Sequence, residues 1–252
     1  MLAGSYYVFD VQPNLIYGGV AFSLLLTFIG WALAKRATRS FKIQLIQALF
    51  MDNGIAVTVN PSKHIDKEHF NSTNTFEPAT LLSGEDCIKG STSNFHFVLS
   101  ELSAKGKLSW TGFDDVYTGL YFYGTWQNPT SIPNFRIQQR GFFDGFVNSS
   151  DMQFQKHFML VDADGNEIDN PKLLDSIPKS LKEGLIRLVN KYHYPMEVIC
   201  QDNQIVVLLQ GGRDYFPLNF DDKVDNKTTF QRISKDVFFT CDLVRVLDGA
   251  GG

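Results

Sequence analysis

The hydrophobic pattern of the chain is dominated by one long uncharged run near its start. Residues 11–34 contain no charged side chain, and Lys35 and Arg36 follow them directly. At about 1.5 Å per residue, a helix of this length spans roughly 36 Å, more than the roughly 30 Å hydrocarbon core of a bilayer. Tyr17 and Trp31 lie toward its two ends, where aromatic side chains suit membrane interfaces. The pattern predicts a transmembrane helix over 11–34.

A cleaved signal peptide and a buried helix of a soluble protein are the alternatives for this run. Residues 1–10 contain no Lys or Arg, so the basic start of a signal peptide is missing. The run also exceeds the usual signal-peptide length of about 7–15 apolar residues, and it is long for a buried helix. Four basic residues follow it: Lys35, Arg36, Arg39 and Lys42. The positive-inside rule then places residues 1–10 outside the cell and the remainder in the cytoplasm, in a plasma (inner) membrane.

An amphipathic helix is predicted next, over residues 35–53. Phe41, Leu45 and Leu49 recur at four-residue steps, and Asn53-Gly54 suits a helix end. The basic start of this helix can contact anionic lipid head groups, or the helix can pack on the following domain; the two are compatible.

The pattern then changes to that of strands and one further helical region. Strands are predicted over 55–59, 92–102, 116–126, 135–138 and 154–161. Asn170-Pro171 predicts a helix start, with Pro178 splitting the helix after one turn. Strands over 196–201 and 204–210 form a hairpin through Asp202-Asn203, and the second strand is apolar on both faces, as in a central strand.

These elements predict an α+β protein with one transmembrane helix and a mainly antiparallel sheet. The soluble domain is expected to span residues 54–248, before a frayed, glycine-rich end at 249–252. Another apolar run, over 235–247, is not assigned to an element.

Composition narrows the function classes. The net charge of -4 argues against a nucleic-acid partner, because such proteins usually carry a basic face. Three cysteines without CxxC spacing indicate neither a disulfide framework nor a zinc knuckle. They suit the reducing cytoplasm as free thiols.

No catalytic, cofactor or metal site emerges from the motifs. His64 and His69 are five residues apart, which places them on different sides of a helix and does not match the HExxH spacing of zinc hydrolases. Asp162 and Asp164 open a segment that lacks the Gly and Glu positions of a calcium loop. Gly211-Gly212 follows a strand without the spacing of a nucleotide-binding loop. We therefore predict a protein that is not an enzyme and has no cofactor.

Several short segments are similar to one known family. Residues 70–72, 84–90, 97–101, 119–122 and 154–161, followed by the Asn-Pro helix and the hairpin, occur in an order that resembles a bacterial family of membrane-associated proteins, the domain-of-unknown-function family 3137. The resemblance covers roughly residues 40–220 and implies a fold and a membrane location but no reaction. Cys87 departs from it, since an aromatic residue is expected there.

Among the resembling positions, Glu85, Asp86 and Glu101 are polar. Two interpretations remain open for them: a turn cap with a surface salt bridge, or a patch that contacts a partner protein. The function that fits best is a non-catalytic accessory or scaffolding subunit whose cytoplasmic domain docks to other proteins of a membrane complex. The alternative is a membrane-anchored ligand-binding or sensory module.

Overall fold

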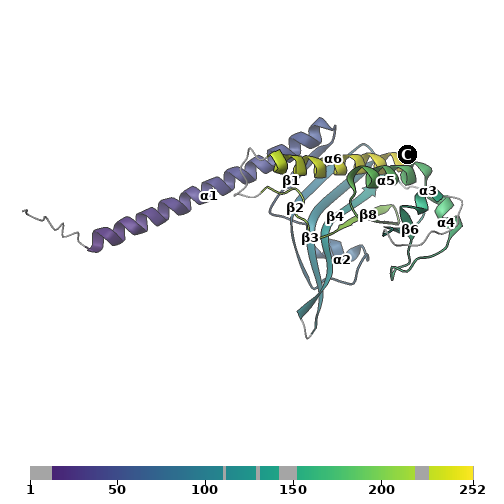
Figure 1. Ribbon diagram of the computed structural model, residues 1–252, viewed down its shortest axis with the longest axis horizontal. Coiled ribbons are helices and arrows are strands. Elements are labelled where there is room, and N and C mark those ends of the chain that lie inside the picture. The colour runs from purple at the N-terminus through teal and green to yellow at the C-terminus, as the bar shows by residue number, and fades with distance from the viewer. Residues whose placement is uncertain (1–12, 110–111, 129–130, 142–151, 219–226, 252) are drawn as a thin grey trace, which may run out of the picture.

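The computed structural model describes residues 13–109, 112–128, 131–141, 152–218 and 227–251, with the side chains of 13–21, 108, 109 and 152 left out. A long helix leads into a body that consists of one sheet with helices on both faces (Figure 1). The predicted tail at 1–10 lies outside the described residues. The body is a mixed α+β structure, as predicted.

The first helix, α1 (Pro13–Asp52), is continuous through both predicted helical segments. Its first half projects from the body as an arm, and its second half packs on the sheet through Ile46 and Phe50, both fully buried (Figure 1). The change from arm to packed helix follows the change in sequence from an all-round apolar run to an amphipathic one.

Eight strands form a single antiparallel sheet in the order β1-β2-β3-β4-β8-β7-β5-β6. Their bounds are β1 (Ala56–Asn60), β2 (Leu81–Ser91), β3 (Phe95–Ser109), β4 (Gly112–Trp126), β5 (Phe135–Gln139), β6 (Phe158–Leu160), β7 (Glu197–Gln201) and β8 (Gln204–Gln210). The prediction of a mainly antiparallel sheet is thus confirmed.

Two hydrophobic clusters cover the two faces of this sheet. Alternate residues of β8 enter different clusters: Val207 faces one and Val206 the other, as the two-residue period of a strand requires. α1, α5 (Lys179–Tyr192) and α6 (Lys227–Ala250) pack on the first face, and the short α2 (Lys67–Ser72) packs on the second (Figure 1). β8 is therefore central and covered on both sides, as predicted.

Local signals account for several boundaries. The side chain of Asn170 caps α4 (Pro171–Ser176) by accepting a hydrogen bond from the amide of Leu173, and Pro178 separates α4 from α5. Asp202 and Asn203 have φ of 47° and 67°, which is the conformation that the hairpin turn needs.

Three predictions about elements were wrong or incomplete. The strand predicted over 154–161 is shorter, because Phe154 lies in the one-turn helix α3 (Met152–Gln155) and only β6 is extended. Strand β2 was missed, although it is 11 residues long. The apolar run over 235–247 lies in α6, which continues through Ala250 and so includes part of the end predicted to fray.

Within the described residues, no helix has an apolar stretch long enough to cross a membrane. Residues 11 and 12 of the predicted 11–34 segment lie outside the described residues, and the Tyr17 side chain is not described either. In the described part of the arm, from Phe22 to Leu33, eight large apolar side chains are each at least 45% exposed: Phe22, Leu24, Leu25, Leu26, Phe28, Ile29, Trp31 and Leu33.

Candidate functional site

A buried ion pair lies where α1 joins the body. Lys42 of α1 forms an ion pair with Asp86 of β2, with 2.6 Å between Nζ and Oδ2. Asp86 is fully buried, and Lys42 is 8% exposed. The position of Asp86 follows from a bulge in β2 between Glu85 and Ile88, where Asp86 takes a φ of 56°.

This ion pair corrects two predictions. Lys42 was predicted to contact the membrane interface, but its side chain turns into the body because the carboxylate of Asp86 needs a cation there. The two interpretations of Asp86 were a turn cap with a surface salt bridge and a partner-contact patch, but its side chain is fully buried and its salt bridge to Lys42 lies inside the protein.

The structure brings the other two polar positions together. Glu85 and Glu101 are directly opposite each other on β2 and β3. Glu85 is exposed, whereas Glu101 is partly buried and its Oε2 accepts a 2.9 Å hydrogen bond from the amide of Tyr215. Glu101 thus holds the segment that follows β8, and of these three acids Glu85 alone is exposed to a partner.

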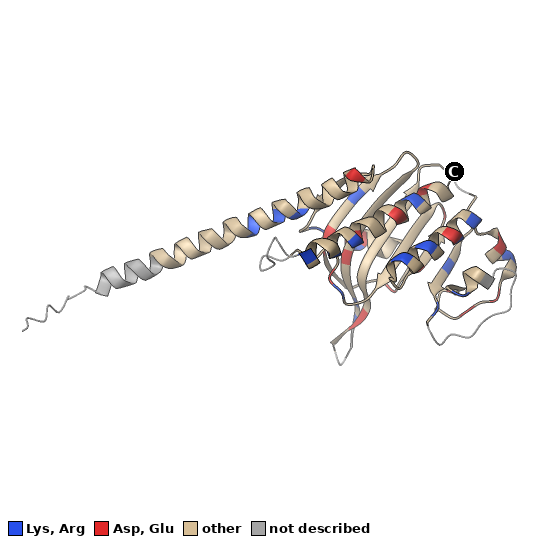
Figure 2. Ribbon diagram, turned by 45° about the horizontal axis from the view of Figure 1, so that its top comes forward, with Lys and Arg blue, Asp and Glu red and all other residues tan. Residues whose placement is uncertain are grey.

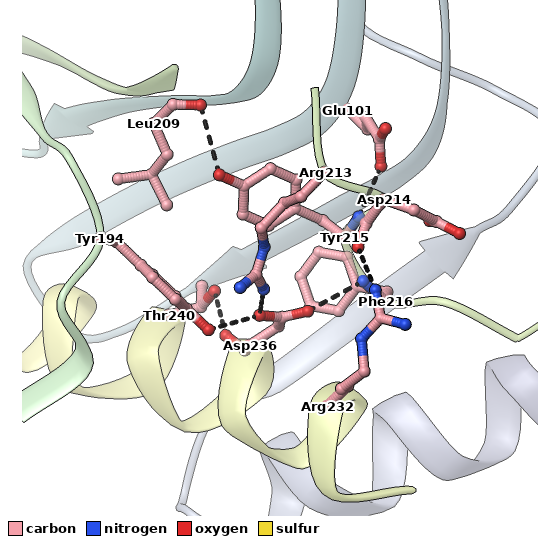
Figure 3. A network of polar contacts seen from close by, with 10 residues as sticks. All are labelled: Glu101, Tyr194, Leu209, Arg213, Asp214, Tyr215, Phe216, Arg232, Asp236 and Thr240. Atoms are coloured by element: carbon pink, nitrogen blue, oxygen red, sulfur yellow. Dashed lines mark hydrogen bonds and ion pairs between the residues drawn. The ribbon is translucent and has the colours of Figure 1, made fainter. Parts of the chain in front are cut away.

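A second buried carboxylate, Asp236 of α6, organises the same segment from the opposite side (Figure 3). Its Oδ1 accepts from Arg213 and, at 2.8 Å, from the hydroxyl of Tyr194. Its Oδ2 accepts from the amide of Phe216 at 3.1 Å. Phe216 is fully buried with a φ of 51°, a rare conformation for a bulky residue, and this hydrogen bond stabilises it.

Arg213 is held between two aromatic rings. Its guanidinium carbon lies 4.3 Å from the ring centroid of Tyr194 and 4.4 Å from that of Tyr215. Cation–π contacts and the ion pair with Asp236 together fix the side chain. The segment from β8 to Phe216 is consequently clamped to both the sheet and α6.

Burial changes the proton affinity of three carboxyls in this region. It raises the pKa of Glu101 to about 7, against the Tyr215 hydrogen bond, and nearby Asp214, Glu85 and Asp86 add to the increase. Burial likewise raises the pKa of Asp86 to about 6 despite the opposing charge of Lys42. The pKa of Asp236 is also raised by burial, although Arg213 opposes this. The region can take up protons near neutral pH.

All three cysteines are free thiols and are buried. Burial raises the pKa of Cys200 and of Cys241 to about 12, which keeps both protonated at neutral pH. Cys87 is buried as well. In the described part of the chain, no group of three or more His, Cys, Asp or Glu side chains is placed to hold a metal ion.

A separate pocket of about 280 Å³ lies beside α2. His64, His69 and His96 line it together with Lys89 and Tyr123. The His69 ring stands edge-on to Tyr123 at 4.3 Å between centroids, and burial lowers the pKa of His69. Imidazole side chains in such a pocket can form hydrogen bonds with a small polar molecule.

Sequence reasoning missed Arg213, Asp236 and the two tyrosines. Arg213 directly follows Gly211-Gly212, a pair that was considered only as a nucleotide-binding loop, and the helix that carries Asp236 was not assigned. A usable signal was present, because Asp236 interrupts an apolar helical face between Ile233 and Val237, where a charge needs a buried partner.

The basic residues predicted at the membrane interface differ in their surroundings. Lys35, Arg36 and Arg39 are exposed, and the ammonium of Lys35 lies 5.0 Å from the ring centroid of Trp31. Arg39 also approaches the side chain of Asn60 at 3.5 Å. These three side chains are free to contact a surface beyond the protein.

No protein-family model, curated protein or solved structure matches this chain. The resemblance to the domain-of-unknown-function family 3137 therefore stays a prediction.

Proposed function

We propose that the protein is a single-pass membrane protein whose α+β body lies in the cytoplasm and docks to other proteins as an accessory or scaffolding subunit of a membrane complex. The exposed apolar arm is the observation that carries this proposal. Leaving its eight large side chains in water costs on the order of 10 kcal/mol, if each gains about 1.5–3 kcal/mol on full burial.

A lipid bilayer is the environment that suits the arm best. Its large side chains are exposed over more than half of the helix circumference, so that contact with a single flat protein surface covers only some of them. The remaining stripe carries the smaller residues Ser23, Thr27, Gly30 and Ala34. The uncharged sequence continues within α1 back to Pro13, and from there to Ala34 the helix rises about 33 Å. Lys35, Arg36 and Arg39 follow at the point where cytoplasmic charges are expected.

The docking role rests on what the body contains. Its buried carboxylates form ion pairs with Lys42 and Arg213 and accept hydrogen bonds from backbone amides. These contacts hold separate segments of the chain together. Among the described residues, the three thiols are buried and no group of metal ligands is formed. A rigid body on a membrane anchor fits a role in assembly.

The arm is tested with charge substitutions and membrane fractionation. Leu25→Glu with Phe28→Glu should release the protein from membranes into the soluble fraction, because two carboxylates in the hydrocarbon region each cost several kcal/mol. Met51→Glu is the matched control: Met51 lies on the same helix and is 72% exposed, but next to the body. Retention of the double variant in carbonate-washed membranes would contradict insertion of the arm.

Native mass spectrometry of the protein in mild detergent tests the docking role. Reproducible companion polypeptides are expected. A lone chain or small homo-oligomer would exclude the subunit role, and such a species carrying a small bound molecule would favour the ligand-binding alternative instead.

A further inference from the structure

We infer that the first turns of α6 form a second membrane contact, which rests on anionic lipid head groups beside α1. This inference depends on the proposed insertion of the arm. It states which face of the body lies against the membrane, and the anchor alone does not determine that orientation.

Charge is the first observation. Between Lys227 and Phe238, the exposed charged side chains of α6 are all basic: Lys227, Arg232 and Lys235. The one acid in this stretch, Asp236, is buried and paired with Arg213. Although the net charge of the chain is -4, the exposed charges of α6 between residues 227 and 238 therefore carry one sign.

Exposed aromatic residues are the second observation. Phe230 is 49% exposed and Phe238 is 41% exposed, on the same side of α6. They line a shallow groove of about 370 Å³ with Lys235, Lys191 and Leu49. Lys227, Lys235 and Phe238 share this side of the helix, whereas Arg232 lies across from Phe230. Aromatic side chains beside basic ones suit the lipid head-group region.

The position of α6 relative to the arm is the third observation. Arg245 of α6 donates a 2.9 Å hydrogen bond to the carbonyl of Asn53, directly after the end of α1, and the two helices pack together. Both views show the N-terminal end of α6 on the side from which the arm leaves the body (Figures 1 and 2).

Because the two helices run in the same direction, their basic residues lie at similar distances from the contact between Arg245 and Asn53. Lys227 lies about 27 Å of helix before Arg245, and Lys35 lies about 27 Å before Asn53. Basic positions cluster on α1 beside the body and at the start of α6 in Figure 2. Each cation near an anionic leaflet contributes about 1 kcal/mol, so the two surfaces together favour one orientation of the body.

Site-specific fluorescence tests the contact in the full-length protein. The three native cysteines are buried, so that a single exposed cysteine can be labelled with the environment-sensitive dye NBD. Three positions are compared in separate variants: Phe230→Cys on α6, Phe28→Cys on the arm and Phe113→Cys at the far end of β4, with native exposures of 49%, 63% and 37%. Each is reconstituted into vesicles of phosphatidylcholine with phosphatidylglycerol, and into phosphatidylcholine alone.

We expect the label at 28 to report a lipid environment in both vesicles and the label at 113 in neither. The label at 230 should shift to shorter wavelength and be quenched by brominated lipid only with phosphatidylglycerol. The shift should be lost at about 1 M salt, where charges are screened within about 3 Å. Lys227→Glu with Arg232→Glu should abolish it, whereas Lys107→Glu, an exposed change on β3, should not.

The outcomes separate the inference from the proposal beneath it. A lipid signal at 28 with none at 230 would overturn the contact by α6 and leave the anchor in place. The absence of a lipid signal at 28 would overturn the proposed insertion, and the inference with it. An equal shift at 230 on neutral vesicles would exclude anionic head groups as the partner.

Discussion

Glu101 shows how a single acidic residue in this fold can serve packing and respond to pH. Its side chain accepts a hydrogen bond from the amide of Tyr215, yet burial raises the pKa of Glu101 to about 7. A folded-state pKa above the ordinary value of 4.5 means that the native protein binds a proton more tightly than the unfolded chain. Ionised Glu101 therefore lowers stability at neutral pH.

The sign of the pH dependence follows from this shift. As pH rises from about 4.5 to 7, the contribution of Glu101 to the free energy of unfolding should fall. Glu101→Gln should flatten this decrease, because glutamine does not titrate and its amide oxygen can still accept from Tyr215. Urea denaturation at several pH values measures the effect, with the exposed Glu68→Gln as control. Equal slopes for the native protein and Glu101→Gln would show that Glu101 is not the responsible group.

Glu85, Asp86 and Glu101 could be selected from the sequence, but their burial and their partners could not be predicted from it. Whether a carboxylate lies at the surface or is paired inside depends on a bulge that turns Asp86 inward and on Lys42, 44 residues earlier in the chain. Neither feature produces a periodic pattern. The partners of buried charges are set by tertiary contacts, which local spacing does not reveal.

At the scale of elements, the pairing of β4 with β8 depends on a close approach at Gly119. A Cβ atom at this position would lie 2.1 Å from the carbonyl oxygen of Leu209, and Gly119 has a φ of 151°. Because Leu209 pairs with the neighbouring Leu120, any movement that relieves this contact disturbs the centre of the sheet.

Gly119→Ala should therefore destabilise the protein by more than Gly211→Ala. Gly211 has a similar φ of 144°, but a Cβ atom added there would meet no other atom within 4 Å, so the control carries the backbone strain alone. We expect about 1 kcal/mol for Gly211→Ala and at least about 3 kcal/mol for Gly119→Ala in urea denaturation. Similar losses for both variants would mean that the sheet accommodates the extra methyl group.

The elements predicted correctly are those with a strong local signal. Asn170-Pro171, Pro178 and Asp202-Asn203 act through their own backbone preferences, so their sequence suffices. β2 lacks such a signal: its Ser-Gly-Glu-Asp stretch resembles a turn, and only pairing with β1 and β3 makes it a strand. In the same way, Phe154 has the character of a strand residue but lies in α3, one turn before β6.

At the scale of the whole molecule, the first half of α1 is the apolar arm and its second half packs on the sheet. The Lys42–Asp86 ion pair links this second half to β2. Movement of the arm relative to the body would have to break this pair or carry β2 with it. Because both partners are buried, the loss of one leaves the other without a counter-charge, which is more costly than the loss of both.

A double-mutant cycle tests this coupling. Lys42→Met should lower the free energy of unfolding by about 3 kcal/mol, because Asp86 would remain buried and unpaired. Adding Asp86→Asn should restore much of this loss, since asparagine carries no charge and tolerates the positive φ at this position. Arg39→Met, an exposed change one turn earlier, should cost less than about 1 kcal/mol. Additive losses for Lys42→Met and Asp86→Asn would show that the pair does not couple α1 to the sheet, and the arm would then be joined to the body by apolar packing alone.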